Sequence, residues 1–181
     1  MFARTERLLL RPGWSEDAPA LVRAIADERI VRMLALVPWP YTLADAEAFL
    51  ARERGPRDVA CLIFLREGGG PRLVGGIGFG RKPGDAEPEF GYWIARPYWG
   101  RGFATEAGAA LIANARDTLR LKRLDAGHFT DNPASGRVLA KLGFRPTGIT
   151  RARYSAGRGA EAQCREFVLE FDAPQAAAMA A

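Results

Sequence analysis

The sequence is poor in the residue types that build metal centres and thiol chemistry. It contains one histidine, His128, and two cysteines, Cys61 and Cys164, each alone in an apolar, strand-like stretch. Structural zinc sites use about four such ligands at short spacing, and redox pairs use Cys-x-x-Cys. The composition therefore predicts a reduced protein without a bound metal ion. A lone strand histidine is more often packed than catalytic, so His128 is left out of the predicted site.

Long apolar runs are also missing. Charged residues occur at Arg4, Glu6 and Arg7 before the first apolar run, and no stretch approaches the roughly 18 uninterrupted apolar residues of a membrane span. We therefore expect a cytoplasmic protein with no membrane partner.

Lysine is scarce although the chain is basic. Of the 26 basic residues only three are lysines, Lys82, Lys122 and Lys141; the others are arginines, and the formal net charge is +5. Arginine binds phosphate bidentately, so this excess suits a phosphate-rich cofactor, although a genome that prefers arginine codons would give the same bias. Nucleic acid is the weakest candidate partner, because the arginines are scattered over every predicted element rather than gathered on one face.

The length and composition suit one globular domain. The chain has 181 residues, of which 48% are hydrophobic and 26% charged, values far from those of disordered chains. We predict a single domain over residues 1–172 and a disordered, alanine-rich tail over residues 173–181.

Hydrophobic periodicity predicts a mixed α/β architecture. Helices are expected to begin near Ser15, Thr42, Ala104 and Asn132, each after a capping residue or a glycine loop. The expected strands are residues 5–10, 59–65, 73–79, 89–94, 124–129, 148–154 and 164–171. This order places one helical crossover in the middle of the sheet.

A glycine loop precedes the crossover helix. Residues 97–104 read Pro-Tyr-Trp-Gly-Arg-Gly-Phe-Ala, and Gly100 and Gly102 allow the backbone to approach a ligand closely. Because a helix N-terminus carries unpaired N–H groups, such a loop can bind a phosphate. It lacks the GK[ST] ending of a P-loop and the GxGxxG spacing of dinucleotide sites, and taken alone it could be a simple turn.

Four segments together are more specific. Gly91–Ile94, Trp99–Ala107, Asn132–Ser135 and Lys141–Phe144 resemble, in order and spacing, the GNAT superfamily of N-acetyltransferases, and more narrowly its RimJ and RimL branch. With the flanking stretches 5–11 and 38–42, the resemblance covers roughly residues 5–171. It implies a mostly antiparallel mixed sheet of about seven strands, splayed between the fourth and fifth, with about four helices.

The resemblance also implies acetyl-CoA as cosubstrate, with no metal. The backbone from about Trp99 to Ala104 would receive the CoA pyrophosphate, with Arg101 nearby and the Thr105 hydroxyl adding a contact. The pantetheine arm would run along the fourth strand at residues 92–95, and Asn132 would hold either the pantetheine or the acetyl end. The implied cofactor contacts are Trp93, Ile94, Trp99, Gly100, Arg101, Gly102, Phe103, Ala104, Thr105 and Asn132.

Acetyl transfer to an amine requires two proton movements. For the acid, Leu139 stands where many superfamily members have a tyrosine, and Ser135 matches the serine of the RimJ and RimL branch. Alternatively, the Ser135 hydroxyl only caps its own helix. For the base, Glu89 is the first choice, although its carboxylate could instead bind the incoming amine. Glu106 is interpreted as a structural first-turn acid.

The acceptor stays open between a protein N-terminus and a small-molecule amine. Trp39, Tyr41 and Tyr92 are predicted to line its pocket, whereas Trp93 is at least as well explained as a core residue. The alternative to an enzyme is a non-catalytic module that senses acetyl-CoA, and the presence of Glu89 and Ser135 counts against it. A homodimer is the default expectation, because dimers are the commonest soluble oligomers.

Overall fold

A computed structural model describes residues 1–67, 70–81, 84 and 86–171. The predicted tail, residues 173–181, lies outside the described residues. Eight strands form one sheet: β1 (Ala3–Arg4), β2 (Leu8–Arg11), β3 (Val59–Glu67), β4 (Gly70–Gly80), β5 (Glu89–Ile94), β6 (Arg123–Phe129), β7 (Arg145–Ser155) and β8 (Ala160–Glu170). The helices are α1 (Ala18–Ile25), α2 (Glu28–Val31), α3 (Leu43–Ala51), α4 (Phe103–Ala113) and α5 (Pro133–Lys141).

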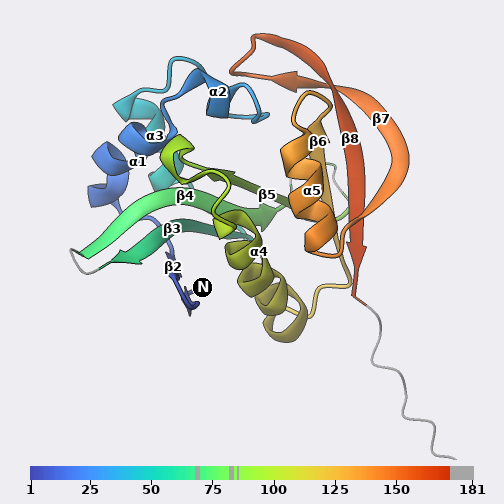
Figure 1. The fold of residues 1–181 in the computed structure, drawn as a ribbon, viewed down its shortest axis with the longest axis horizontal. Helices are drawn as coiled ribbons and strands as arrows, with labels where there is room; N and C mark the ends of the chain where they lie inside the picture. Colours follow the sequence, from blue (N-terminus) through green and yellow to red (C-terminus); the bar gives the residue numbers. More distant parts are fainter. Residues whose placement is uncertain (68–69, 82–83, 85, 172–181) are drawn as a thin grey trace, which may run out of the picture.

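The sheet is mixed and opens in its middle. Its order is β1-β2-β3-β4-β5-β6-β8-β7, and the β5–β6 pair is parallel whereas the other pairs are antiparallel. β5 pairs with β6 only at Glu89 and Phe90, after which the two strands diverge (Figure 1). The predicted architecture and the splay are confirmed, with eight strands rather than about seven.

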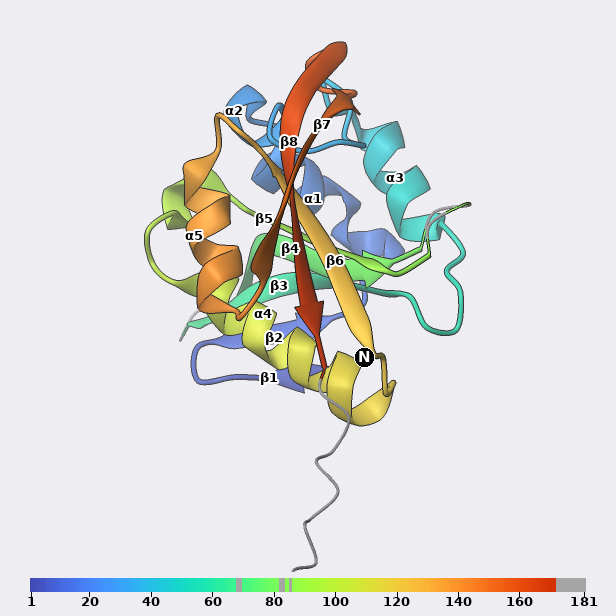
Figure 2. The ribbon, with the colours of Figure 1, turned by 90° about the vertical axis from the view of Figure 1, so that its right-hand side faces the viewer.

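Helices cover both faces of the sheet (Figure 2). α4 and α5 pack on one face over a cluster that includes Phe103, Leu111 and Leu139. α1 and α3 cover the other face, where Leu21 and Ala46 are buried. Within the described ranges, no helix is both long and apolar enough to cross a membrane.

Several local predictions are confirmed. Thr42 caps α3 and exchanges hydrogen bonds with Asp45, as the spacing indicates. Gly143 follows α5 with a φ of 89°, the left-handed conformation that suits a helix C-terminus. β5 spans the predicted residues, Glu89–Ile94.

Other boundaries differ from the prediction. Only the second half of the first predicted strand, residues 5–10, is a strand, β2. Its first residues form the turn from β1, in which Thr5 donates its backbone N–H to the Leu8 carbonyl and its Oγ accepts from the Leu8 N–H. α2 is a single turn capped by Asp27, too short to leave a periodic pattern. β7 and β8 are longer than predicted and form an extended hairpin. The prediction was too short because β7 is mostly exposed and both strands carry many polar side chains, which give no apolar pattern at the strand ends.

Candidate active site

The glycine loop turns directly into α4. Gly100 and Gly102 have φ angles of 74° and 79°, which strain any residue with a side chain. The first helical hydrogen bond runs from the Glu106 N–H to the Gly102 carbonyl. The N–H groups of Phe103, Ala104 and Thr105 therefore precede the helical ladder, as at any helix start, and are free to bind an anion.

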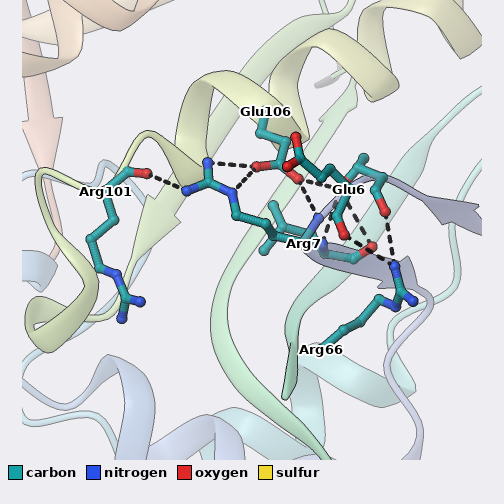
Figure 3. A network of polar contacts seen from close by, with 7 residues as sticks. Glu6, Arg7, Arg66, Arg101 and Glu106 are labelled. Carbon is teal, nitrogen blue, oxygen red and sulfur yellow. Dashed lines mark hydrogen bonds and ion pairs between the residues drawn. The ribbon is translucent and has the colours of Figure 1, made fainter. Parts of the chain in front are cut away.

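The turn between β1 and β2 braces this loop (Figure 3). Arg7 donates from its guanidinium to Glu106 at 2.7 Å and to the Arg101 carbonyl at 3.1 Å. Thr5 Oγ donates to Glu106 at 2.5 Å. Burial alone would raise the pKa of Glu106, but the bonds from Thr5 and Arg7 lower it. Glu106 thus has the structural role expected of it.

The Arg101 side chain extends away from this brace (Figure 3). Its guanidinium lies 5.7 Å from the Tyr98 ring centre and 5.0 Å from that of Phe103. Arg101 is exposed, and in the described part of the chain no ion pair to it is found. A cation in this place, beside the N-terminus of α4, can add charge to a phosphate site.

Beyond Phe90, β5 presents an edge next to the loop that β6 no longer pairs. The Ala95 N–H bonds to Val74 on β4, and successive residues of a strand alternate sides. The peptide groups of Tyr92 and Ile94 therefore face the gap from which β6 diverges. Trp99 donates its indole N–H to the Ile94 carbonyl at 2.6 Å, which ties the loop to the end of β5.

Ser135 and Tyr92 meet across this gap. Tyr92 Oη donates to Ser135 Oγ at 3.0 Å, joining β5 to the first turn of α5. The cap of α5 is Asn132, whose side-chain oxygen accepts from the Ser135 N–H at 3.3 Å. The Ser135 hydroxyl is therefore not needed for capping. Leu139, one turn further on, is buried in the core.

Glu89 lies at the start of β5 and is paired with Arg153 of β7. The two side chains form a bidentate ion pair, in which Arg153 Nη2 lies 2.6 Å from Glu89 Oε2. Burial opposes the charge of Arg153, but the hydrogen bond and charge of Glu89 raise its pKa. A carboxylate held by a guanidinium is a weaker base than a lone one.

The middle of β5 is open on the face opposite α4 and α5. Gly91 is exposed, and a Cβ built on it would meet nothing within 4 Å, although β5 is a central strand. The neighbours on the same face are Glu89 and Trp93, two residues away on either side. Trp93 is partly buried against the core cluster that α1 and α3 cover, as expected if it is a core residue.

The other predicted aromatic residues fall in different surroundings. Trp39 is 42% exposed, whereas Tyr41 is 8% exposed and packs with α1 and α3. Burial raises the pKa of Tyr41 to about 12, and the nearby Asp45 adds to the effect. Tyr41 is thus placed as a core residue rather than as an open wall, and Tyr92 faces Ser135.

The remaining titratable candidates are packed. His128 is buried, with Nδ1 2.8 Å from the Phe129 carbonyl and its ring against Phe167. Cys61 and Cys164 are both buried and form no disulfide. No cluster of three metal-ligating side chains is found among the described residues.

Sequence reasoning missed two residues of the site. Arg7 and Arg153 lie 94 and 64 residues from their partners Arg101 and Glu89. Both lie in arginine-rich stretches, so neither their residue type nor their spacing indicated a role in the site. The only available hint was the complementary charge of Glu89 and Glu106, which no local pattern connects to a particular arginine.

Comparison with known proteins decides the family. The model of the acetyltransferase (GNAT) domain matches residues 7–145. The Bacillus subtilis protein YoaA, named an uncharacterized N-acetyltransferase, is 30% identical over 151 residues, which cover 81% of this chain and 84% of YoaA. The chain belongs to the GNAT family of acetyltransferases.

A further relative agrees with the RimJ and RimL branch, and two solved structures share the fold. A ribosomal-protein-serine acetyltransferase of Escherichia coli is 34% identical over 73 residues, covering 40% of this chain and 41% of its own. A GNAT acetyltransferase structure from Bacillus anthracis superposes with a TM-score of 0.78 at 25% identity, covering 94% of this chain and 98% of its own. A structure of RimL with coenzyme A shares the fold, with a TM-score of 0.77 at 19% identity, covering 95% of this chain and 99% of its own.

The GNAT assignment makes this chain an N-acetyltransferase. The predicted loop, strand edge and Asn132–Ser135 segment converge on the gap between β5 and β6. Tyr41 alone among the predicted site residues is buried in the core cluster on the α1 side.

Proposed function

We propose that this GNAT protein transfers the acetyl group of acetyl-CoA to a primary amine by direct attack of the amine nitrogen on the thioester carbon. The observation that carries the proposal is the opening of the sheet between β5 and β6 beside the N-terminus of α4. A strand edge that no neighbouring strand pairs suits an amide-containing arm, and a helix N-terminus suits a pyrophosphate.

The donor would lie along β5. The N–H groups of Phe103, Ala104 and Thr105, with Arg101, would hold the phosphates, and the N–H and carbonyl of Tyr92 and the N–H of Ile94 would hold the pantetheine arm. A backbone N–H on β5 aimed at the thioester oxygen would stabilise the oxyanion as the amine attacks.

Ser135 would carry the proton from nitrogen to sulfur. When the carbon–sulfur bond breaks, its electron pair goes to sulfur, which receives the Ser135 hydroxyl proton. Ser135 in turn takes the proton that the amine nitrogen loses, so the hydroxyl is regenerated. Such proton transfer contributes about 100-fold or more to a rate.

The amine would approach over Gly91, on the face opposite α4. The open space there is bounded by Glu89 and Trp93. Because Glu89 is paired with Arg153, we propose that its carboxylate first attracts the ammonium form of the acceptor. When Arg153 releases it, Glu89 takes the proton that turns the ammonium into the attacking amine, and the second proton, lost by the nitrogen after attack, goes to Ser135. Trp39, exposed in the α2–α3 loop, is the proposed outer wall of the pocket.

A protein N-terminus is the first acceptor class to test. The Escherichia coli relative is named for ribosomal-protein serine acetylation, and RimL for α-N acetylation of ribosomal protein L7/L12. Small amines such as polyamines, amino acids and aminoglycosides are the second class. We expect the protein to act in the cytoplasm, where acetyl-CoA is made available, and to form a homodimer.

The test is a calorimetric titration with acetyl-CoA followed by thiol release with a panel of N-terminal peptides and amines. Binding with amine-dependent release supports the enzyme and begins to name the acceptor. Binding without release from any acceptor would favour an acetyl-CoA sensor, and no binding would overturn the proposal.

A further inference from the structure

Serine is a poor acid by itself. Its hydroxyl has one proton and two lone pairs, and it rotates freely unless a partner fixes it. In a helix N-terminus that hydroxyl commonly turns back to a backbone group. A serine that shuttles a proton therefore needs a neighbour that holds its oxygen and directs its hydrogen.

Tyr92 is placed to do this. Its Oη lies 3.0 Å from Ser135 Oγ, and the phenol, as the more acidic hydroxyl, is the donor of the pair. The Tyr92 ring is fixed between β5 and α5, with the Phe90 ring centre 6.0 Å away. Since Asn132 already caps the helix through the Ser135 N–H, the Ser135 hydrogen has no competing task there.

Resting on the proposed function, we propose that Tyr92 is a positioning residue for Ser135: its phenol donates to Ser135 Oγ and leaves the Ser135 hydrogen directed at the departing sulfur. Tyr92 itself keeps its proton throughout. It thus acts within the proton path rather than as the acceptor wall expected from the sequence.

The protonation state of Tyr92 agrees with this role. Burial raises the pKa of its phenol, although the hydrogen bond to Ser135 acts in the opposite direction. The phenol therefore stays a donor at neutral pH. A bond from a neutral donor also makes the Ser135 hydroxyl a better donor in turn, because hydrogen bonds in a chain polarise one another.

The experiment is a double-mutant cycle with Tyr92→Phe and Ser135→Ala, measured by thiol release. Tyr92→Phe keeps the ring and removes only the hydroxyl, so kcat is expected to fall about tenfold, the value of one hydrogen bond, while the KM of the amine stays near wild type. Ser135→Ala should lower kcat about 100-fold. Adding Tyr92→Phe to Ser135→Ala should cause no further loss, because Tyr92 acts through Ser135.

Controls separate this inference from the proposed function and from misfolding. Tyr154→Phe, which removes a phenol hydroxyl from an exposed residue of β7, should leave kcat unchanged. Acetyl-CoA affinity and the thermal midpoint check that Tyr92→Phe is folded, and Ser135→Ala tests the coupling from the other end without touching the ring. If the wild type releases thiol but the two losses multiply, or if Tyr92→Phe raises only the KM of the amine, the positioning role is wrong. A wild type that releases no thiol would instead overturn the proposed function.

Discussion

The glycine loop offers a quantitative test in a pair of matched substitutions. Gly102 has a φ of 79°, and a side chain there costs about 1–3 kcal/mol of backbone strain. A Cβ would meet only Arg7 Nη2 at 3.6 Å, an ordinary contact, so the cost comes from the backbone and not from a clash. Because the loop is exposed, Gly102→Val should relax it in the free protein.

Binding of CoA would then have to restore the strained loop. The 1–3 kcal/mol of strain corresponds to a dissociation constant about 5- to 150-fold higher for Gly102→Val. Gly148→Val is the control, because Gly148 has a φ of 82° and open space around it but lies on β7. Both variants should lower the thermal midpoint, and only Gly102→Val should weaken CoA binding by calorimetry. Unchanged CoA affinity in Gly102→Val, or an equal loss in Gly148→Val, would refute the phosphate-loop assignment.

Three further substitutions test the surroundings of the site. Glu106→Gln should lower the free energy of unfolding at pH 7 by about 1–2 kcal/mol, the value of a partly exposed charged hydrogen bond, as measured by denaturant titration. Folding lowers the pKa of Glu106 from its usual 4.5, so the Glu106 carboxylate stabilises the folded protein fully above pH 4.5. The difference in unfolding free energy between Glu106→Gln and wild type should therefore close as the pH falls through the folded pKa. A difference that persists in acid would contradict the bracing role of Glu106. Gly91→Leu should fill the open space on β5 and raise the KM of the amine severalfold at unchanged CoA affinity, and a loss confined to CoA binding would place the acceptor elsewhere. If Glu89 is the base, Glu89→Gln should lower kcat and leave the KM of the amine normal. If Glu89→Gln and Arg153→Met both raise the KM of the amine, the ion pair binds the acceptor or shapes its site.

Local patterns in the sequence determined most of the elements of this fold. The Thr42–Asp45 spacing predicted the cap of α3, and the glycine loop before Phe103 predicted a helix start with its unpaired N–H groups. Such features depend on residues within one turn of each other, so they can be predicted without knowledge of the partners. The resemblance to GNAT enzymes then supplied the opening of the sheet between the fourth and fifth predicted strands, and the strand order came from the structure.

Only the tertiary structure decided what the individual side chains do. Glu89 is a carboxylate at the predicted position, yet its partner Arg153 comes from a strand 64 residues away and changes its chemistry. Ser135 could be a cap or an acid in the sequence, and the structure assigns the cap to Asn132 and a phenol partner, Tyr92, to its hydroxyl. These roles depend on contacts between distant segments, whose geometry is set by packing across the whole sheet and leaves no periodic trace in the chain.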